Sequence, residues 1–325
     1  MNFIMKKILL CLLSVFAFAP MSEAQNAISN YTVCIGKASY ANTDFILLRK
    51  FKQRNKTKFL AVAVYSLNTS ILDSAEVKFS LSYWQQLKSI YSNTPFIKAL
   101  IDVEAKSFLI QDAGVTHGYP SEKGITLTVD LCPSHKPLDR SIFNSVINAF
   151  AGIEKPVPLG LSISGRFLLN HEDDMQWINK LQRDNLIKVT WINHTYSHYY
   201  DPKVPLTENF LLKPGTNIHS EVLKLEQLML EKDMLPSVFF RFPGLVSDSA
   251  IVKQIITLGL IPIGSDAWLA KGNQAKNGSI VLIHGNGNEP VGVKDFISLI
   301  KNKSQLVKSR QWLMFDLSNS VKGDF

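Results

Sequence analysis

Long apolar stretches are scarce in this 325-residue chain, and the one that is present lies at its start. It covers Ile8–Ala19, follows Lys6 and Lys7, and is succeeded by small residues. The run is too short for an ordinary membrane span, and its pattern is typical of a secretory signal. We therefore expect residues 1–24 to be removed on export, leaving a periplasmic or secreted protein without a stable membrane span. An uncleaved anchor is the alternative.

Cysteine is also scarce, with three residues in the whole chain. Cys11 lies inside the apolar run, so Cys34 and Cys132 would remain after export. In an oxidising compartment these two could pair and tie the N-terminal region to the segment after residue 130, and the sequence leaves this open. No neighbouring pattern specifies a cysteine hydrolase, so we do not expect Cys132 to be a nucleophile.

Acidic side chains are fewer than basic ones, 27 against 35, and the formal charge is +8. The excess fits attraction to anionic cell-surface polymers or simple solubility. Part of it is concentrated in residues 49–58, between the apolar segments Phe45–Leu48 and Phe59–Tyr65, which predicts a solvated hairpin tip. The interleaved aromatics of single-strand binding proteins are missing, so we expect no nucleic-acid partner.

Two histidines four residues apart form the most informative pattern. His194 and His198 follow the β-prone run Leu186–Ile192, where a strand ends and a loop or helical turn begins. On a helical turn this spacing projects both imidazoles from one face. Neutral imidazole binds zinc and similar metals well, so the pair could supply half of a metal site. The pattern alone is weak evidence, since it is also compatible with one packed and one solvated histidine.

Four other segments place an ionisable residue at, or just after, the end of a short apolar stretch. These residues are Asp130, Arg241, Asp266 and His284. In an α/β fold the carboxyl ends of the strands converge on one face. We therefore expect all four to meet His194, although they are far apart in the sequence.

The order of these motifs resembles the polysaccharide deacetylase (NodB-homology) family of carbohydrate esterases. The resemblance covers residues 124–303 and rests on Thr128-Val-Asp130, His194-Thr-Tyr-Ser-His198, Arg241-Phe-Pro243, Asp266-Ala-Trp268 and Leu282-Ile-His284.

The chain departs from the family in the first motif. Family members usually carry two consecutive Asp residues there, a catalytic base and a metal ligand, whereas Leu131 follows Asp130 here. His135 and His171 are candidates for the missing ligand, and Asp130 could alternatively bind the metal itself.

The resemblance implies catalytic roles for four residues. Asp130 would be the general base that activates water, and Arg241 would hold it ionised and oriented. His284 would protonate the leaving nitrogen, while Asp266 would bond the other ring nitrogen of this histidine.

The resemblance also implies a cofactor and a sugar site. A divalent metal, expected to be zinc, would lie on His194 and His198. The backbone amide of Gly244 would stabilise the oxyanion, and Trp268 and Tyr199 would contact the substrate.

From residue 124 onward, strand and helix patterns alternate. Strands are expected at Ile125–Val129, Val157–Ile163, Ile187–Ile192, Ser237–Phe240, Leu260–Ile263, Ile280–Ile283 and Trp312–Leu317. Helical stripes are marked by Ile142, Val146 and Phe150, by Ile218, Val222, Leu225 and Met229, and by a third set that Ser247 would cap and Gly259 would stop. Such βα units build a parallel sheet, open or closed, and the resemblance implies an irregular (β/α) barrel.

The segment before the alternating region carries no recognised motif. In residues 25–123, the hairpin and the amphipathic stretches Trp84–Tyr91 and Phe96–Ala105 predict a small α+β element. We expect it to pack on the catalytic domain at residues 124–325.

Two classes of function remain open. The first is an exported hydrolase that removes N-acetyl or similar acyl groups from a polysaccharide or cell-wall glycan, with hydrolysis of another non-peptide C–N bond as a variant. The second is a carbohydrate-binding relative with incomplete metal ligation. Retention of Asp130, Arg241, Asp266 and His284 favours the enzyme, and the missing second Asp favours the binder.

Overall fold

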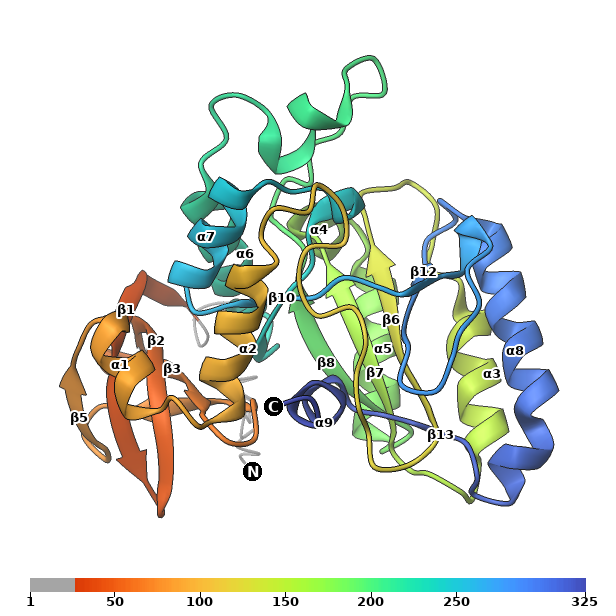
Figure 1. The fold of residues 1–325 in the computed structure, drawn as a ribbon, viewed down its shortest axis with the longest axis horizontal. Coiled ribbons are helices and arrows are strands. Elements are labelled where there is room, and N and C mark those ends of the chain that lie inside the picture. The colour runs from red at the N-terminus through yellow and green to blue at the C-terminus, as the bar shows by residue number, and fades with distance from the viewer. Residues whose placement is uncertain (1–26) are drawn as a thin grey trace, which may run out of the picture.

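Two β-sheets organise the fold (Figure 1). The computed structural model describes residues 27–325, so the expected signal at residues 1–24 lies outside the described part. The N-terminal sheet is antiparallel, with the order β4-β3-β2-β1-β5, and the second sheet has the order β10-β9-β8-β7-β6-β12-β11, with β13 beside β6. All pairs in the second sheet are parallel. The expected α/β architecture, an irregular barrel with a small N-terminal α+β element, is confirmed.

The N-terminal sheet contains the predicted hairpin, although its turn is much shorter than expected. Its strands are β1 (Ile28–Tyr40), β2 (Thr43–Gln53), β3 (Lys56–Ala63), β4 (Thr69–Asp73) and β5 (Lys78–Leu81). Arg54 and Asn55 form the turn with φ angles of 51° and 62°, and such left-handed pairs match the twist of the flanking strands. Most of the basic run at residues 49–58 is solvated at the end of this hairpin, as predicted, but the strands continue to the turn and Arg49 is buried.

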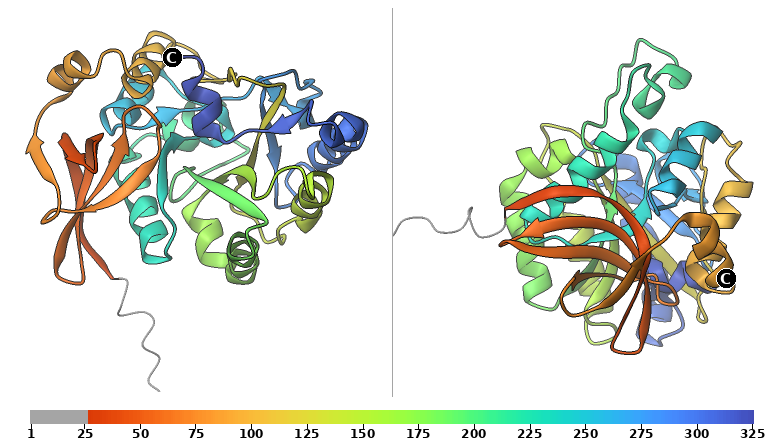
Figure 2. Two further views of the ribbon diagram at one scale, coloured as in Figure 1. Left: turned by 90° about the horizontal axis from the view of Figure 1, so that it is seen from below. Right: turned by 90° about the vertical axis from the view of Figure 1, so that its left-hand side faces the viewer.

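The N-terminal sheet is fixed to the rest of the chain by a buried ion pair. Arg49 Nε lies 2.7 Å from Glu226 Oε2, and Arg49 Nη2 lies 2.9 Å from Glu226 Oε1. Glu226 belongs to α6 (Ile218–Glu231). Figure 2 shows the sheet as a curved layer on one flank of the molecule, and one apolar cluster, which includes Ile46, Phe96 and Phe240, joins it to the parallel sheet.

The parallel sheet supplies the framework of the site. Its strands are β6 (Gly124–Leu131), β7 (Val157–Ile163), β8 (Ile187–Asn193), β9 (Pro236–Phe240), β10 (Ile261–Pro262), β11 (Ala267–Trp268), β12 (Ile280–His284) and β13 (Leu313–Met314). Every residue of β6 and β7 is buried, as expected for strands covered on both faces. Each expected strand is present, but the last is cut short because Leu317 begins α9 (Leu317–Lys322).

Helices cover both the parallel sheet and the junction with the N-terminal sheet. The remaining helices are α1 (Trp84–Ile90), α2 (Pro95–Ala105), α3 (Arg140–Phe150), α4 (Gly165–Asn170), α5 (Glu172–Arg183), α7 (Ser249–Thr257) and α8 (Pro290–Lys308). Short 3-10 turns occur at Leu206–Glu208, Phe210–Leu212, Pro243–Leu245 and Leu269–Lys271. Within residues 27–325, no helix combines the length and apolar character needed to cross a membrane.

The N-terminal cap of α7 differs from the expectation by one residue. Asp248, not Ser247, accepts the hydrogen bond from the Ile251 backbone N–H, at 2.7 Å. The hydroxyl of Ser247 instead donates to the Leu109 carbonyl at 3.3 Å. Both Ser and Asp can cap a helix. Because the hydroxyl of Ser247 is bonded to the segment around Leu109, Asp248 provides the cap.

Candidate active site

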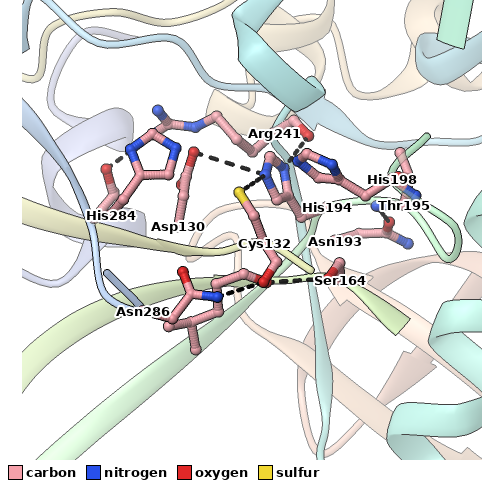
Figure 3. Close-up of polar contacts among 12 residues, drawn as sticks. Asp130, Cys132, Ser164, Asn193, His194, Thr195, His198, Arg241, His284 and Asn286 are labelled. Atoms are coloured by element: carbon pink, nitrogen blue, oxygen red, sulfur yellow. Dashed lines mark hydrogen bonds and ion pairs between the residues drawn. The ribbon is translucent and has the colours of Figure 1, made fainter. Parts of the chain in front are cut away.

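The carboxyl ends of four parallel strands bring the expected residues together (Figure 3). Asp130 in β6 is directly paired in register with His284 in β12. The last residues of β8 and β9 are likewise paired, so His194 and Arg241 begin adjacent loops. Four of the five residues expected to meet, Asp130, His194, Arg241 and His284, therefore lie together at this edge, whereas Asp266 pairs with His117 instead.

The two motif histidines lie on a tight loop rather than on a helical turn. Thr195 and His198 have φ angles of 69° and 45°, a conformation that side-chain-bearing residues rarely adopt. The Thr195 N–H donates to Asn193 Oδ1 at 3.0 Å, and the Ser197 N–H donates to Glu221 Oε2 at 2.8 Å. These bonds hold the loop between β8 and α6 and bring the His194 and His198 rings to a centroid distance of 4.7 Å.

Hydrogen bonding fixes the orientation of His194. Its Nδ1 lies 2.9 Å from the Arg241 carbonyl oxygen, and a carbonyl can only accept, so Nδ1 carries the proton. In the neutral imidazole Nε2 is then the unprotonated nitrogen, and it faces Cys132 Sγ at 3.6 Å and Asp130 Oδ2 at 3.8 Å. This is the arrangement by which proteins present a histidine to a metal.

Cys132 completes a group of three metal-ligating side chains. One ligand atom each from Cys132, His194 and His198 lies within 4.8 Å of the other two. Both Cys132 and Cys34 are free thiols, so the two cysteines do not form a disulfide. The sequence contained a signal for this role, because Asp130 and Cys132 are two residues apart and strand side chains two apart share a face.

The two histidines considered as replacements for the missing carboxylate ligand are not part of this group. The ring nitrogens of His171 lie 2.8 Å from the Ser134 carbonyl oxygen and 3.3 Å from an Asp174 oxygen. His135 is exposed and does not belong to the cluster. Neither prediction is supported, because both ring nitrogens of His171 have partners outside the cluster and His135 faces solvent.

Electrostatic interactions in the cluster favour an ionised thiol. Burial raises the pKa of Cys132, but the nearby histidines, His198 above all, hold it well below its usual range. Burial lowers the pKa of His194, while Asp130 and Cys132 raise it, and the net shift is upward. A cavity that favours a thiolate beside imidazoles suits the binding of a cation.

Arg241 is buried close to Asp130. Within residues 27–325, however, the two side chains form no ion pair. Arg241 Nη2 donates to Thr128 Oγ1 at 2.9 Å, while Nε and Nη1 have no hydrogen-bond partner in residues 27–325. Burial lowers the pKa of Arg241, and the charges of Asp130 and Asp112 oppose this shift. Arg241 is therefore expected to act on Asp130 through its charge and not through a direct hydrogen bond.

The expectation that Asp266 bonds the ring nitrogen of His284 is wrong. Glu289 Oε2, not Asp266, lies 2.8 Å from His284 Nδ1, and the same oxygen accepts from Trp268 Nε1 at 2.7 Å. Burial lowers the pKa of His284, but Cys132 and Glu289 raise it to about 10. Sequence reasoning missed Glu289 because it lies in a loop outside the five motifs.

Asp266 contacts other residues than His284. Its Oδ2 lies 2.7 Å from His117 Nδ1 and accepts from Ser279 Oγ at 3.2 Å. The backbone N–H of Asp266 donates to the Thr116 carbonyl at 3.1 Å. This bond draws the loop toward the segment around residue 117 and directs the carboxylate away from His284.

An open cavity of about 1160 Å³ covers the cluster. Its lining includes the three residues expected at the substrate site, Tyr199, Gly244 and Trp268. Gly244 has a φ of 61°, and a Cβ there would lie 2.6 Å from the Phe210 ring, so no larger residue fits. A second cavity of about 500 Å³ adjoins the first and shares Tyr199 with it.

Comparison with known proteins gave structural matches, whereas no family model matches the chain. A family 4 carbohydrate esterase from Bacillus anthracis is 15% identical, with a TM-score of 0.49, over 69% of this chain and 91% of that one. A peptidoglycan N-acetylglucosamine deacetylase is 18% identical, with a TM-score of 0.46, over 69% and 96%. A family 4 pseudoenzyme from Bacillus anthracis is 11% identical, with a TM-score of 0.44, over 92% and 91%. In its motifs the chain resembles the polysaccharide deacetylase family, and these structural matches are to family 4 carbohydrate esterases.

Proposed function

We propose that the protein is an exported hydrolase that removes N-acetyl groups from a glycan by metal-assisted amide hydrolysis. One observation carries the proposal: a buried carboxylate, a carboxylate-paired histidine and a cluster of metal-ligating side chains converge beneath a single open cavity. Amide hydrolysis needs an activated water, a stabilised oxyanion and a protonated leaving group. The residues in the cavity can meet each of these needs.

The metal would be held by His194 and His198 and is expected to be zinc. The donor atoms fit such an ion, because His194 is oriented by the Arg241 carbonyl and the buried Nε2 of His198 has no partner within the described chain. When bound, a divalent ion supplies Lewis-acid polarisation of the acetyl carbonyl and of water.

Asp130 acts as the general base. It is 3% exposed, and its Oδ1 has no hydrogen-bond partner among residues 27–325, which leaves a lone pair available for a water proton. The buried guanidinium of Arg241 lies near Asp130 without a hydrogen bond to it, so the proton-accepting oxygen of the base stays unoccupied.

His284 acts as the general acid. Its raised pKa, about 10, keeps the imidazole protonated at neutral pH. Glu289 binds Nδ1 and leaves Nε2 to donate its proton to the departing sugar nitrogen. The backbone amide of Gly244 supports the oxyanion, and Trp268 forms a wall of the sugar site.

The substrate class follows from the shape of the site. The two adjoining cavities share Arg166, Ser197, Tyr199 and Phe210, which gives a binding surface longer than a single sugar. We therefore propose an N-acetylated polysaccharide or cell-wall glycan as substrate. Tyr199 lines both cavities and would stack on a sugar ring of the substrate, and Lys213 Nζ lies 3.7 Å from the centroid of its ring.

Replacement of Asp130 by Asn tests this function. Asn has nearly the same shape but is a poor base, so acetate release should fall roughly a hundredfold or more while glycan binding is retained. Turnover is measured as acetate released from N-acetylated oligosaccharides by metal-loaded protein, and binding by calorimetry. Normal turnover of Asp130→Asn would remove Asp130 as the base. A metal-loaded wild type that binds such glycans and releases no acetate would support the carbohydrate-binding alternative.

A further inference from the structure

We propose that Cys132 is the third protein ligand of the metal centre and that its thiolate makes the site selective for a thiophilic ion. This inference rests on the metal centre of the proposed function and identifies what replaces the missing carboxylate. Cys132 lies two residues after Asp130, at the end of β6, and faces the cavity.

The separation of two of the donor atoms, Cys132 Sγ and His194 Nε2, fits a shared ion. A tetrahedral zinc site with a Zn–S bond of about 2.3 Å and a Zn–N bond of about 2.05 Å places sulfur and nitrogen about 3.6 Å apart. Cys132 Sγ and His194 Nε2 are 3.6 Å apart. Asp130 Oδ2 is 3.8 Å from the same nitrogen, longer than the roughly 3.3 Å that an oxygen ligand would require. The thiol, rather than the carboxylate, has the spacing of a ligand.

The backbone holds the thiol in this position. Asn286 is buried, and its side-chain amide donates to the Cys132 carbonyl oxygen. The Gly285 N–H donates to the Asp130 carbonyl at 3.0 Å. These bonds attach the end of β6 to the segment after β12, so the ligand is placed before any ion binds, as metal sites require of their surroundings.

The same strand explains why the usual ligand position is occupied by Leu131. Leu131 is fully buried in the apolar cluster with Val129, Leu138 and Phe143. A carboxylate at this position would lose its hydration in an apolar core, which is costly for a charge without a partner. Alternation along β6 turns residue 131 into the core and residue 132 toward the cavity.

A thiolate ligand changes which metal the site prefers. Sulfur ligands favour zinc and other soft ions, whereas carboxylate ligands also suit manganese and magnesium. One sulfur and two imidazoles leave the fourth tetrahedral position open for substrate or water, as in catalytic zinc sites. We therefore expect zinc to be retained in the presence of excess manganese or magnesium.

Cobalt substitution tests the ligand directly. Co²⁺ bound by a thiolate gives an intense near-ultraviolet charge-transfer band, whereas Co²⁺ bound by nitrogen and oxygen alone does not. The full-length mature protein should show this band, Cys132→Ser and Cys132→Asp should lose it, and Cys34→Ser should retain it as the matched control. Loss of a direct ligand should weaken zinc binding of Cys132→Ser by more than the roughly hundredfold effect of losing an outer-sphere partner. Circular dichroism melting of each variant checks that the fold is intact.

The possible failures of this inference and of the proposed function are distinguishable. If wild-type protein binds Co²⁺ without the charge-transfer band, or if Cys34→Ser removes the band, Cys132 is not the ligand and the metal binds through other side chains. If no metal binds, both the ligand assignment and metal-assisted hydrolysis are wrong. If the band is present and depends on Cys132 but no acetate is released from any glycan, the result supports Cys132 as a ligand and contradicts the deacetylase function.

Discussion

At the scale of single residues, Glu289 takes the role that was expected of Asp266. Glu289 contacts the ring nitrogen of His284 and the indole of Trp268, while Asp266 contacts His117 outside the cluster. Glu289 is therefore a positioning residue for His284 and at the same time fixes the wall of the sugar site. A carboxylate in this place holds the histidine in one tautomer and supports its charge.

We predict that Glu289→Gln and Asp266→Asn will affect turnover differently. Loss of the carboxylate beside His284 should lower kcat about ten- to a hundredfold with little change in KM. Asp266→Asn is the matched control and should remain within a few-fold of wild type, because its carboxylate does not reach His284. Steady-state acetate release measures both. A larger loss in Asp266→Asn than in Glu289→Gln would reverse the assignment.

At the scale of structural elements, α6 links the N-terminal sheet to the site. Its Glu221 accepts from Ser197 in the histidine loop, and its Glu226 holds Arg49 of β2. Arg49 also donates to the Leu258 carbonyl at 2.6 Å, and the Tyr31 hydroxyl donates to Glu226 at 3.0 Å. This network is fully buried, so each charge depends on its partner.

We predict that Arg49→Met will destabilise the protein by about 3–5 kcal/mol, because it leaves Glu226 buried without its cation. The double variant Arg49→Met/Glu226→Leu should recover much of this loss, since apolar pairs often replace buried ion pairs without cost. Urea unfolding of wild type, the single variant and the double variant measures their free energies of unfolding. Lys180→Met, which removes an exposed pair with Asp184, is the control and should leave the midpoint nearly unchanged. Equal stability of the single and double variants would contradict this prediction, because it would show that Glu226 is stabilised in Arg49→Met by groups other than Arg49.

At the scale of the whole molecule, one acidic group makes stability depend on pH near neutrality. Burial raises the pKa of Glu154 to about 7, although its Oε2 accepts from the Met314 N–H at 3.2 Å. The folded state therefore holds a proton that the unfolded state releases at about pH 4.5. Stability should fall as pH rises between these two values, because ionised Glu154 is better solvated in the unfolded chain.

We predict that Glu154→Gln will remove the contribution of Glu154 to this pH dependence. The variant should match wild type at pH 4.5 and exceed it by about 1–2 kcal/mol at pH 8, a figure reduced for partial solvent exposure. Urea unfolding at both pH values measures the difference. Glu76→Gln, at an exposed position, controls for the loss of a surface charge. Parallel pH profiles for wild type and Glu154→Gln would show that Glu154 is not buried as described.

The sequence alone determined the order of strands and helices and most of the site. Alternating apolar segments set the parallel sheet, and a residue that ends such a strand must lie at its carboxyl edge. Asp130, His194, Arg241 and His284 were therefore predictable, as were the helices that begin near Arg140 and Ile218. Local patterns also located the hairpin, since periodicity and turn residues act over short distances.

Only the tertiary structure decided which side chains became partners. Cys132 joins the histidine pair because β8 folds beside β7 and β6, Glu289 reaches His284 because a loop returns before α8, and Arg49 is buried because α6 supplies its counter-ion. These contacts join residues that lie in different elements, and their distances depend on loop geometry that no local pattern encodes. The physical reason is that side-chain pairing is set by packing in three dimensions, whereas the sequence pattern records only which face of each element is buried.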